Sequence, residues 1–405
     1  MTDQVSKKTG RVGKTDRWLL PEGIAEVLPE QAKKLELLRR KLLDLYHSWG
    51  YDLVMPPLIE YLDSLLVGTG NDLNLQTFKI IDQLTGRLMG VRADMTPQVA
   101  RIDAHMLKCE APERLCYIGP VLHTLPSGFD RSRAPLQVGA ELFGHAGPES
   151  DAEVLRLMVE TLKSGGIEQI HVDLGHVGIF RGLARDAGLE SEQEVQLFEA
   201  LQRKAKPEIE AYLGDWGIQA DKQKRLLALI DLNGDERVLD DAQTMLEGAG
   251  ADVMTALENL RQIAARVRRH LDGLPLYYDL AELRGYRYQT GVVFAAFVPG
   301  HGQEIARGGR YDAIGESFGR ARPATGFSTD LKTLAHLGSV ALQPDLGILA
   351  PTEDDPALDQ RIAELRQAGE RVIVKLSGQE GKISCTACDR TLALENGLWN
   401  VVSLG

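Results

Sequence analysis

Side chains suited to holding a small zwitterion gather in one stretch of the chain, Ala281–Asp312. Arg284, Tyr286 and Tyr288 alternate at its start, and an apolar run, Val292–Val298, follows before a Pro-Gly pair. This pattern predicts two long strands joined by a turn, with the polar residues at a strand end. An arginine and tyrosines placed there could bind the charged groups of an amino acid. A core hairpin with surface tyrosines would give the same pattern.

A second polar group ends a predicted hairpin at 77–94, which turns around a Thr-Gly pair. Arg92, Asp94 and Thr96 follow each other at steps of two, so a strand would place them on one face. A helix is predicted to begin at Pro97, because proline suits the first turn of a helix. The hairpin would therefore deliver a carboxylate and a hydroxyl to the start of a helix.

A third polar group lies along a strand predicted at 136–144. Gln137, Gly139 and Glu141 occupy one face, and apolar residues occupy the positions between them. The apolar set is expected to pack in the core, while Gly139 leaves the sheet accessible from the polar side. A polar strand face commonly meets solvent. Because the Asp94 and Arg284 segments carry polar groups of the same kind, we favour a ligand pocket for this face.

The rest of the sequence predicts the helices and strands that must position these polar groups. Apolar residues at three- and four-residue steps predict an amphipathic helix over 29–49. The proline-broken segment after it, Gly50–Pro57, suits an edge element that makes either a dimer contact or an internal sheet edge. Residues 314–337 are predicted to form a short helix, a turn that includes Gly326, and a second helix. A strand, a helix and another strand are predicted from residue 345 onwards, as in a small α/β unit.

Composition and charge exclude several classes of protein. The chain has 405 residues, 43% of them hydrophobic and 26% charged, with a net charge of −12. The acidic balance disfavours a protein that grips a phosphate backbone. No apolar run approaches the length of a membrane span. A polar N-terminus without a secretory pattern and four cysteines favour a reducing cytoplasm.

Metal sites are not predicted. Cys385 and Cys388 form a CxxC pair, but no other cysteine or histidine has the spacing that would complete a four-ligand zinc site. No phosphate-loop fingerprint or nucleophile elbow is present either. Arg131 and Arg133, in the loop before the Gln137 strand, fit an ordinary solvated loop better than a phosphate site. The sequence therefore predicts no cofactor.

Together these segments resemble the catalytic core of histidyl-tRNA synthetase and its paralogues. The segments that carry the likeness are Gly50–Pro57, Arg92–Thr96, Tyr117–Pro120, Gln137–Gly144, Leu283–Tyr288 and Gly308–Asp312. The resemblance implies an α+β fold of the class II aminoacyl-tRNA synthetase type, with an antiparallel sheet flanked by helices. It implies a tail at 1–18, a core at 19–340 with a helical insertion at about 177–270, and a small α/β domain at 345–405.

The resemblance also implies a histidine pocket. The matching residues are Asp94, Thr96 and Gln137 for the α-amino group, Arg284 for the α-carboxylate, Glu141 and Tyr288 for the imidazole, and Tyr311 to close the pocket. These pairings agree with the charges involved, since carboxylates suit an ammonium and a guanidinium suits a carboxylate. Gln289 departs from the family, which has a second tyrosine there.

The cations needed for adenylation are missing. His123 stands where the family has an arginine, and Thr333 replaces a second arginine, while Asp330 replaces a glycine. A hydroxyl cannot substitute for the guanidinium fork that stabilises charge on a transferring phosphate. We therefore expect no aminoacylation, and no catalytic residue is assigned.

One paralogous family keeps histidine recognition without these arginines, namely the regulatory subunits of ATP phosphoribosyltransferase. The resemblance implies a short-form catalytic subunit as partner, a hetero-octamer, a homodimer through Gly50–Pro57, and feedback inhibition by L-histidine. It implies no tRNA and no membrane. Two alternatives remain: an active histidyl-tRNA synthetase, and an RNA-binding or signalling paralogue on the same core.

Overall fold

The structure is a computed structural model that describes residues 18–67, 71–126, 132–282, 285–286, 288–340, 346–377 and 388–404. Contacts between residues divide the chain into two compact units, Met1–Val340 and Ala341–Gly405. In the part of the chain that is described, no helix is long and apolar enough to cross a membrane.

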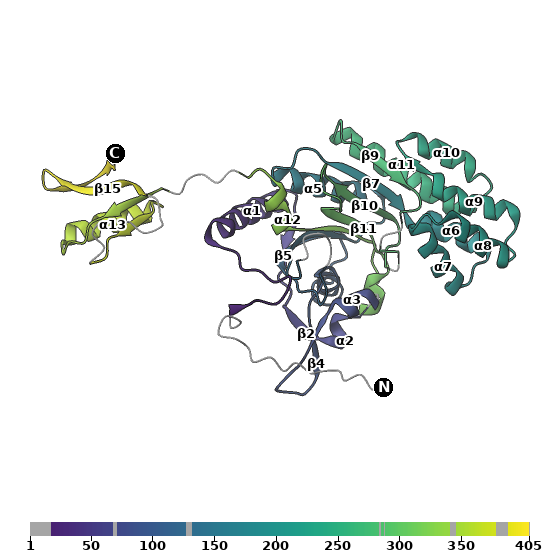
Figure 1. The fold of residues 1–405 in the computed structure, drawn as a ribbon, viewed down its shortest axis with the longest axis horizontal. Helices are drawn as coiled ribbons and strands as arrows, with labels where there is room; N and C mark the ends of the chain where they lie inside the picture. Colours follow the sequence, from purple (N-terminus) through teal and green to yellow (C-terminus); the bar gives the residue numbers. More distant parts are fainter. Residues whose placement is uncertain are drawn as a thin grey trace, which may run out of the picture. The chain divides into compact units, whose positions relative to one another are not determined.

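The first unit is built on a large, mostly antiparallel sheet with helices around it (Figure 1). Among the described residues this sheet has nine strands. In order across the sheet they are β1 (Asp52–Leu53), β5 (Glu113–Pro120), β6 (Leu136–Phe143), β12 (Ala324–Asp330), β11 (Ala306–Arg310), β10 (Val292–Phe297), β7 (His171–His176), β9 (Leu276–Asp279) and β8 (Asn233–Gly234). The pairs β1–β5 and β7–β9 run parallel. The predicted antiparallel sheet flanked by helices is confirmed.

Three helices cover one face of this sheet: α1 (Pro29–Ser48), α5 (Pro148–Ser164) and α12 (Leu331–Leu337). The apolar stripe predicted for the first of them is buried, with Leu38 and Leu42 fully inaccessible to solvent. The apolar face of β6 packs in the same core. Since side chains alternate along a strand, the polar face of β6 points to the opposite side of the sheet.

Smaller elements cover that opposite side. The predicted hairpin is present as β3 (Phe78–Ile81) and β4 (Leu88–Val91), which join β2 (Ile59–Tyr61) in a three-stranded sheet. The accompanying helices are α2 (Leu62–Leu65), α3 (Asn71–Gln76), α4 (Thr96–Arg101), the π-helical turn η2 (Ile102–Leu107) and the 3-10 helix η3 (Ile314–Phe318). A second hydrophobic cluster, which includes Met95, Tyr117 and Tyr311, joins them to the main sheet.

The expectation that Arg92, Asp94 and Thr96 share a strand face is wrong. β4 ends at Val91, and Thr96 already begins α4, with Pro97 in its first turn as predicted. Arg92 is buried, and its guanidinium donates to the carbonyl oxygens of Pro56 at 2.6 Å and of Pro120 at 2.9 Å. The arginine thus binds backbone acceptors near prolines, and the chain leaves the strand to bring Asp94 and Thr96 inwards.

The described residues at the polar start of the Ala281–Asp312 stretch do not form a strand. Gly285 has a left-handed φ of +68°, and its carbonyl accepts from the N–H groups of Tyr288 and Gln289, so the chain makes a turn before β10 begins. Tyr286 is buried and stacks on Phe198, with ring centroids 4.9 Å apart. The described tyrosines of this alternation therefore lie in or next to a turn. The two strands predicted on either side of the Pro-Gly pair do form, and they pair antiparallel as β10 and β11.

A strand was missed in the segment 314–337. Gly326, predicted in a turn, lies in the middle of β12, between β6 and β11. This strand, sequence ATGFSTD, has no regular alternation of apolar and polar residues, so the pattern that indicates a strand is missing from it. Pairing with two neighbours supplies the backbone hydrogen bonds that stabilise it.

Between β7 and β9 the chain is mainly helical, apart from the short β8. The helices, gathered at one end of the first unit in Figure 1, are α6 (Val177–Ala187), α7 (Ser191–Gln202), α8 (Lys206–Asp215), α9 (Ala220–Asp231), α10 (Arg237–Met245) and α11 (Ala251–His270). α11 packs on α5 and α6, which attaches this segment to the sheet.

The second unit is a small α/β structure. Its described strands follow the order β14 (Val372–Val374), β13 (Gly347–Ala350), β15 (Cys388–Glu395) and β16 (Leu398–Ser403), with α13 (Pro356–Gln367) packed on them. Cys388 begins β15, whereas Cys385 lies outside the described residues. Among the described residues, no group of three or more His, Cys, Asp or Glu side chains could hold a metal ion.

Candidate functional site

A buried carboxylate forms the floor of the candidate site. Glu141 on β6 accepts hydrogen bonds from the hydroxyls of Thr96 at 3.0 Å and Tyr117 at 2.9 Å, and a short one from Tyr311. The residue is 1% exposed, and burial raises the pKa of Glu141 to about 8 despite these three donors. Burial and the neighbouring Glu141 also hold the pKa values of Tyr117 and Tyr311 well above their ordinary value. The site is therefore a carboxyl group caged by three hydroxyls.

A second polar group, centred on Gln137, lies four residues before Glu141 on the same strand. The Gln137 amide nitrogen donates to Asp94 Oδ1 at 2.8 Å, and its oxygen accepts from the Met95 N–H at 2.9 Å. Asp94 Oδ1 also accepts from the Thr96 N–H at 3.0 Å. These bonds hold the loop after β4 against β6. Five predicted site residues are thereby brought together: Asp94, Thr96, Gln137, Glu141 and Tyr311.

Glycines on three adjacent strands make room for the side chains of the site. Gly139 pairs with Ser328 across β6 and β12, and Glu141, Gly326 and Gly309 form one row across β6, β12 and β11. A Cβ at Gly139 would lie 2.5 Å from the Tyr117 hydroxyl, and one at Gly326 would lie 1.4 Å from Glu141 Oε2. The space beside these glycines is thus occupied by the side chains of the site.

Gly326→Ala is expected to destabilise the protein by about 1–3 kcal/mol, because an added methyl overpacks the floor and displaces the Glu141 carboxylate. Urea unfolding measures the change. Gly214→Ala is the matched control: it lies within α8 with nothing within 4 Å of its added Cβ, so we expect a gain of about 0.5–1 kcal/mol. Equal effects at the two glycines would contradict the packing argument.

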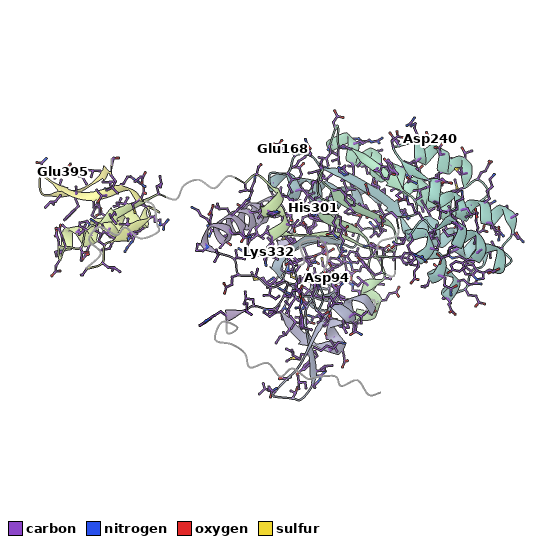
Figure 2. All side chains as sticks on the ribbon, viewed as in Figure 1. Asp94, Glu168, Asp240, His301, Lys332 and Glu395 are labelled. Carbon is purple, nitrogen blue, oxygen red and sulfur yellow. The ribbon has the colours of Figure 1, made fainter. Side chains whose placement is uncertain are left out.

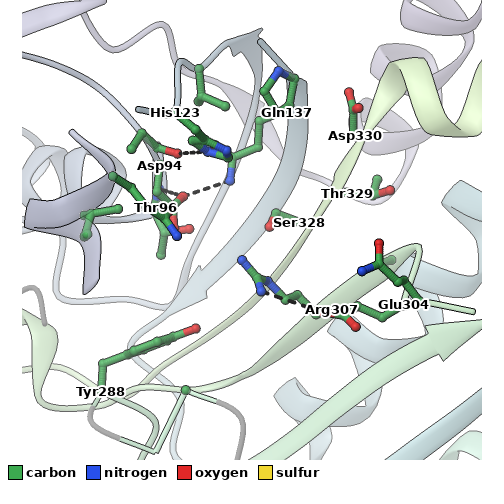
Figure 3. A pocket seen from close by; sticks show the side chains of 18 of the residues that line it. Asp94, Thr96, His123, Gln137, Tyr288, Glu304, Arg307, Ser328, Thr329 and Asp330 are labelled. Carbon is green, nitrogen blue, oxygen red and sulfur yellow. Dashed lines mark hydrogen bonds and ion pairs between the residues drawn. The ribbon is translucent and has the colours of Figure 1, made fainter. Parts of the chain in front are cut away.

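Two connected cavities lie over this floor. A recess of about 80 Å³ is lined by Glu141 and Tyr311, and a chamber of about 730 Å³ lies beside it. Both are lined by Asp94, Thr96, Gly285, Tyr288, Arg307 and Ser328. Figure 3 shows the labelled side chains converging on this space from several elements. Figure 2 places Asp94 near the centre of the first unit, away from Asp240 in the helical segment.

The other predicted site residues have different outcomes. Tyr288 lines both cavities and is 42% exposed, so its ring is available to a ligand. Arg284 lies outside the described residues. Sequence reasoning gave no site role to Tyr117, Arg307 or Ser328. Tyr117 could have been found from the strand pairing. It lies directly opposite Gly139 on the neighbouring strand, and a glycine there leaves room for a bulky ring.

The positions without arginines lie in the larger chamber. The His123 ring nitrogen Nε2 is 2.9 Å from the Ala93 carbonyl oxygen, and the Thr333 hydroxyl donates to Asp330 Oδ2 at 3.2 Å. Asp330 Oδ1 accepts from the N–H groups of Leu136 at 2.9 Å and Lys332 at 3.1 Å, which caps α12. His123 and Thr333 therefore present no guanidinium to the chamber. Asp330, which the family lacks, caps α12.

The comparisons first define a class of fold. A family model described as histidyl-tRNA synthetase matches residues 23–334. The crystal structure of histidyl-tRNA synthetase from Nostoc sp. PCC 7120 superposes with a TM-score of 0.73 at 18% identity, covering 95% of this chain and 97% of that chain. The first unit therefore has the class II histidyl-tRNA synthetase fold.

A second set of matches narrows this class. A family model described as ATP phosphoribosyltransferase subunit HisZ C-terminal domain matches residues 345–402. An ATP phosphoribosyltransferase regulatory subunit from Thioalkalivibrio sulfidiphilus is 60% identical over 392 residues, covering 96% of this chain and 99% of that relative. One from Alkalilimnicola ehrlichii is 58% identical over 386 residues, covering 95% and 96%. The chain belongs to the family of ATP phosphoribosyltransferase regulatory subunits.

A solved structure connects the two classes. The crystal structure of an ATP phosphoribosyltransferase regulatory subunit/histidyl-tRNA synthetase from Bacillus halodurans C superposes with a TM-score of 0.80 at 26% identity. The alignment covers 91% of this chain and 95% of that chain. The synthetase-like core and the small second unit thus occur together in a related protein.

Proposed function

We propose that this protein is a non-catalytic regulatory subunit that supports a short-form ATP phosphoribosyltransferase and carries feedback inhibition by L-histidine. The observation that carries the proposal is a caged carboxylate pocket of the histidyl-tRNA synthetase fold without the adenylation cations. The close relatives named as regulatory subunits add independent support. The runner-up, an active histidyl-tRNA synthetase, would need cations that the chamber lacks at His123 and Thr333.

L-Histidine is the proposed ligand of the cavities over β6. The proposed contacts are Asp94, Thr96 and Gln137 with the α-amino group, Glu141 and Tyr288 with the imidazole, Tyr311 as the closing side chain, and Arg284, on resemblance alone, with the α-carboxylate. Support comes from the cage around Glu141, because a carboxyl group and hydroxyls can bind both nitrogens of an imidazole. For feedback, histidine must bind one state of the complex more tightly than another.

The proposed assembly is a hetero-octamer with the short catalytic chain, in which regulatory subunits dimerise through Gly50–Pro57. Support for the dimer contact comes from β1, the outermost strand of the main sheet. Leu53 is 42% exposed and Met55 is 72% exposed beside it, which is unusual for large apolar side chains next to an open strand edge. No tRNA is proposed as a ligand, in keeping with the net charge of −12.

Co-expression with a short phosphoribosyltransferase tests the proposal. We expect the purified complex to convert ATP and phosphoribosyl pyrophosphate faster than the catalytic chain alone, and L-histidine to suppress that gain. The protein by itself is expected to give no histidine-dependent exchange between ATP and pyrophosphate. Robust exchange would instead support the synthetase, and a complex unaffected by histidine would remove the feedback part.

A further inference from the structure

One arginine outside the predicted set reaches the junction of the two cavities. Arg307 lies on β11 and lines both the recess and the chamber, and Figure 3 shows its guanidinium in the open space between Tyr288 and Ser328. Its side chain is 65% exposed, and its ion pair with Glu304 is 3.7 Å long, beyond hydrogen-bonding distance. An exposed pair of this length contributes little, so a better-placed anion can displace Glu304 from the guanidinium.

The register of the sheet places this arginine at a fixed offset from Glu141. Glu141, Gly326 and Gly309 form one row across β6, β12 and β11, and Gly139, Ser328 and Arg307 form the next row on the same face. The rows are about 7 Å apart, since a strand rises about 3.3 Å per residue. Between Glu141 and Arg307 these rows hold three glycines and a serine, which add no large side chain of their own, and the Tyr117 hydroxyl lies beside Gly139.

That offset suits the two ends of an amino acid. A histidine whose imidazole meets Glu141 carries its α-carboxylate several ångströms away, within reach of a long arginine side chain. Asp94 lines the junction opposite Arg307 and offers a carboxylate for the α-amino group. Each group of one ligand would then have a partner in the pocket: Glu141 for the imidazole, Asp94 for the ammonium and Arg307 for the carboxylate.

We infer that Arg307 is the residue that binds the α-carboxylate of the amino acid held in the recess. The inference rests on the proposed function and deepens it, since it names a carboxylate-selecting residue for the same site. It moves this role from Arg284, which the family resemblance suggested, to a side chain placed in the cavity. The consequence is selectivity: a ligand without a carboxylate loses its charge-assisted pair with the guanidinium.

The test compares L-histidine with L-histidinol, which has a hydroxymethyl group in place of the carboxylate, by calorimetry on the full-length protein. Wild type is expected to bind histidine about 10- to 100-fold more tightly than histidinol. Arg307→Gln is expected to bind both ligands about as weakly as wild type binds histidinol. Arg185→Gln, an exposed arginine paired with Asp252 on the helical segment, is the control and should keep wild-type selectivity.

The outcomes separate this inference from the proposed function. If wild type does not bind histidine, alone or with its catalytic partner, the histidine part of the proposed function fails. If wild type binds histidine but Arg307→Gln keeps full selectivity, or wild type shows none, only the inference is overturned. Arg284→Gln is measured in parallel. If only that variant loses its selectivity for histidine over histidinol, Arg284 binds the α-carboxylate and the inference is overturned. If both variants lose it, Arg307 and Arg284 bind the carboxylate together. Thermal unfolding of Arg307→Gln should match wild type, because its side chain is exposed.

Discussion

Glu141→Gln is expected to weaken L-histidine binding by about 10- to 100-fold and to raise the stability of the protein above that of wild type at alkaline pH. The binding loss follows because a carboxyl group can give its proton to the imidazole and form a charge-assisted hydrogen bond, which an amide cannot do. The stability gain follows because glutamine stays neutral at alkaline pH, whereas burial penalises the ionised carboxylate of Glu141 there.

The direction of the pH effect comes from the raised pKa of Glu141. That pKa is about 8 in the folded protein against an ordinary value of 4.5, because burial penalises the ionised form. Between these values the folded state binds more protons than the unfolded state, so the free energy of unfolding falls as pH rises. This contribution is complete below about pH 4.5 and is lost as pH rises through about 8.

Urea unfolding at pH 5, 7 and 9 measures this effect. The difference in unfolding free energy between Glu141→Gln and wild type is expected to grow with pH by several kcal/mol, on the order of 2–5. Glu26→Gln changes an exposed glutamate and is the matched control, with a difference that stays flat. Parallel pH profiles for wild type and Glu141→Gln would show that this carboxyl group does not titrate as its burial requires.

Asp151→Ala is expected to lower the free energy of unfolding by about 3–5 kcal/mol, the second large effect. Arg310 Nη2 lies 3.0 Å from Asp151 Oδ1, and the two side chains are 7% and 0% exposed. Removing the carboxylate leaves a buried guanidinium with the Ser150 hydroxyl, backbone carbonyls and Asp312 as its remaining partners. Because Arg310 precedes Tyr311, the same change should also loosen the cage around Glu141.

Chemical denaturation of Asp151→Ala, with histidine calorimetry alongside, measures both effects. The control is Asp252→Ala, which removes an ion pair with Arg185 whose side chains are 76% and 47% exposed. We expect that variant to lose less than about 1 kcal/mol, because exposed pairs are screened by water. A loss at Asp151 no larger than the loss at Asp252 would mean that the buried pair is dispensable to the fold.

Sequence patterns predicted the elements that have strong local periodicity. The sequence predicts the stripe of α1 and the two faces of β6 because apolar residues repeat at 3.6 or at 2 residues within one element. β12 is not predicted because its sequence, ATGFSTD, carries no such repeat. The turn at Gly285 was taken for a strand because alternation alone does not reveal a left-handed residue.

The sequence by itself determined the chemistry available at the site: a carboxylate and an amide on one face of β6, and no arginine at His123 or Thr333. Only the tertiary structure decided which strands are neighbours. The pairing of β6, β12 and β11 places Gly326 against Glu141 and brings Arg307 to the cavities. The physical reason is that alternation is a local property of one strand, whereas register depends on long-range pairing that no single segment encodes.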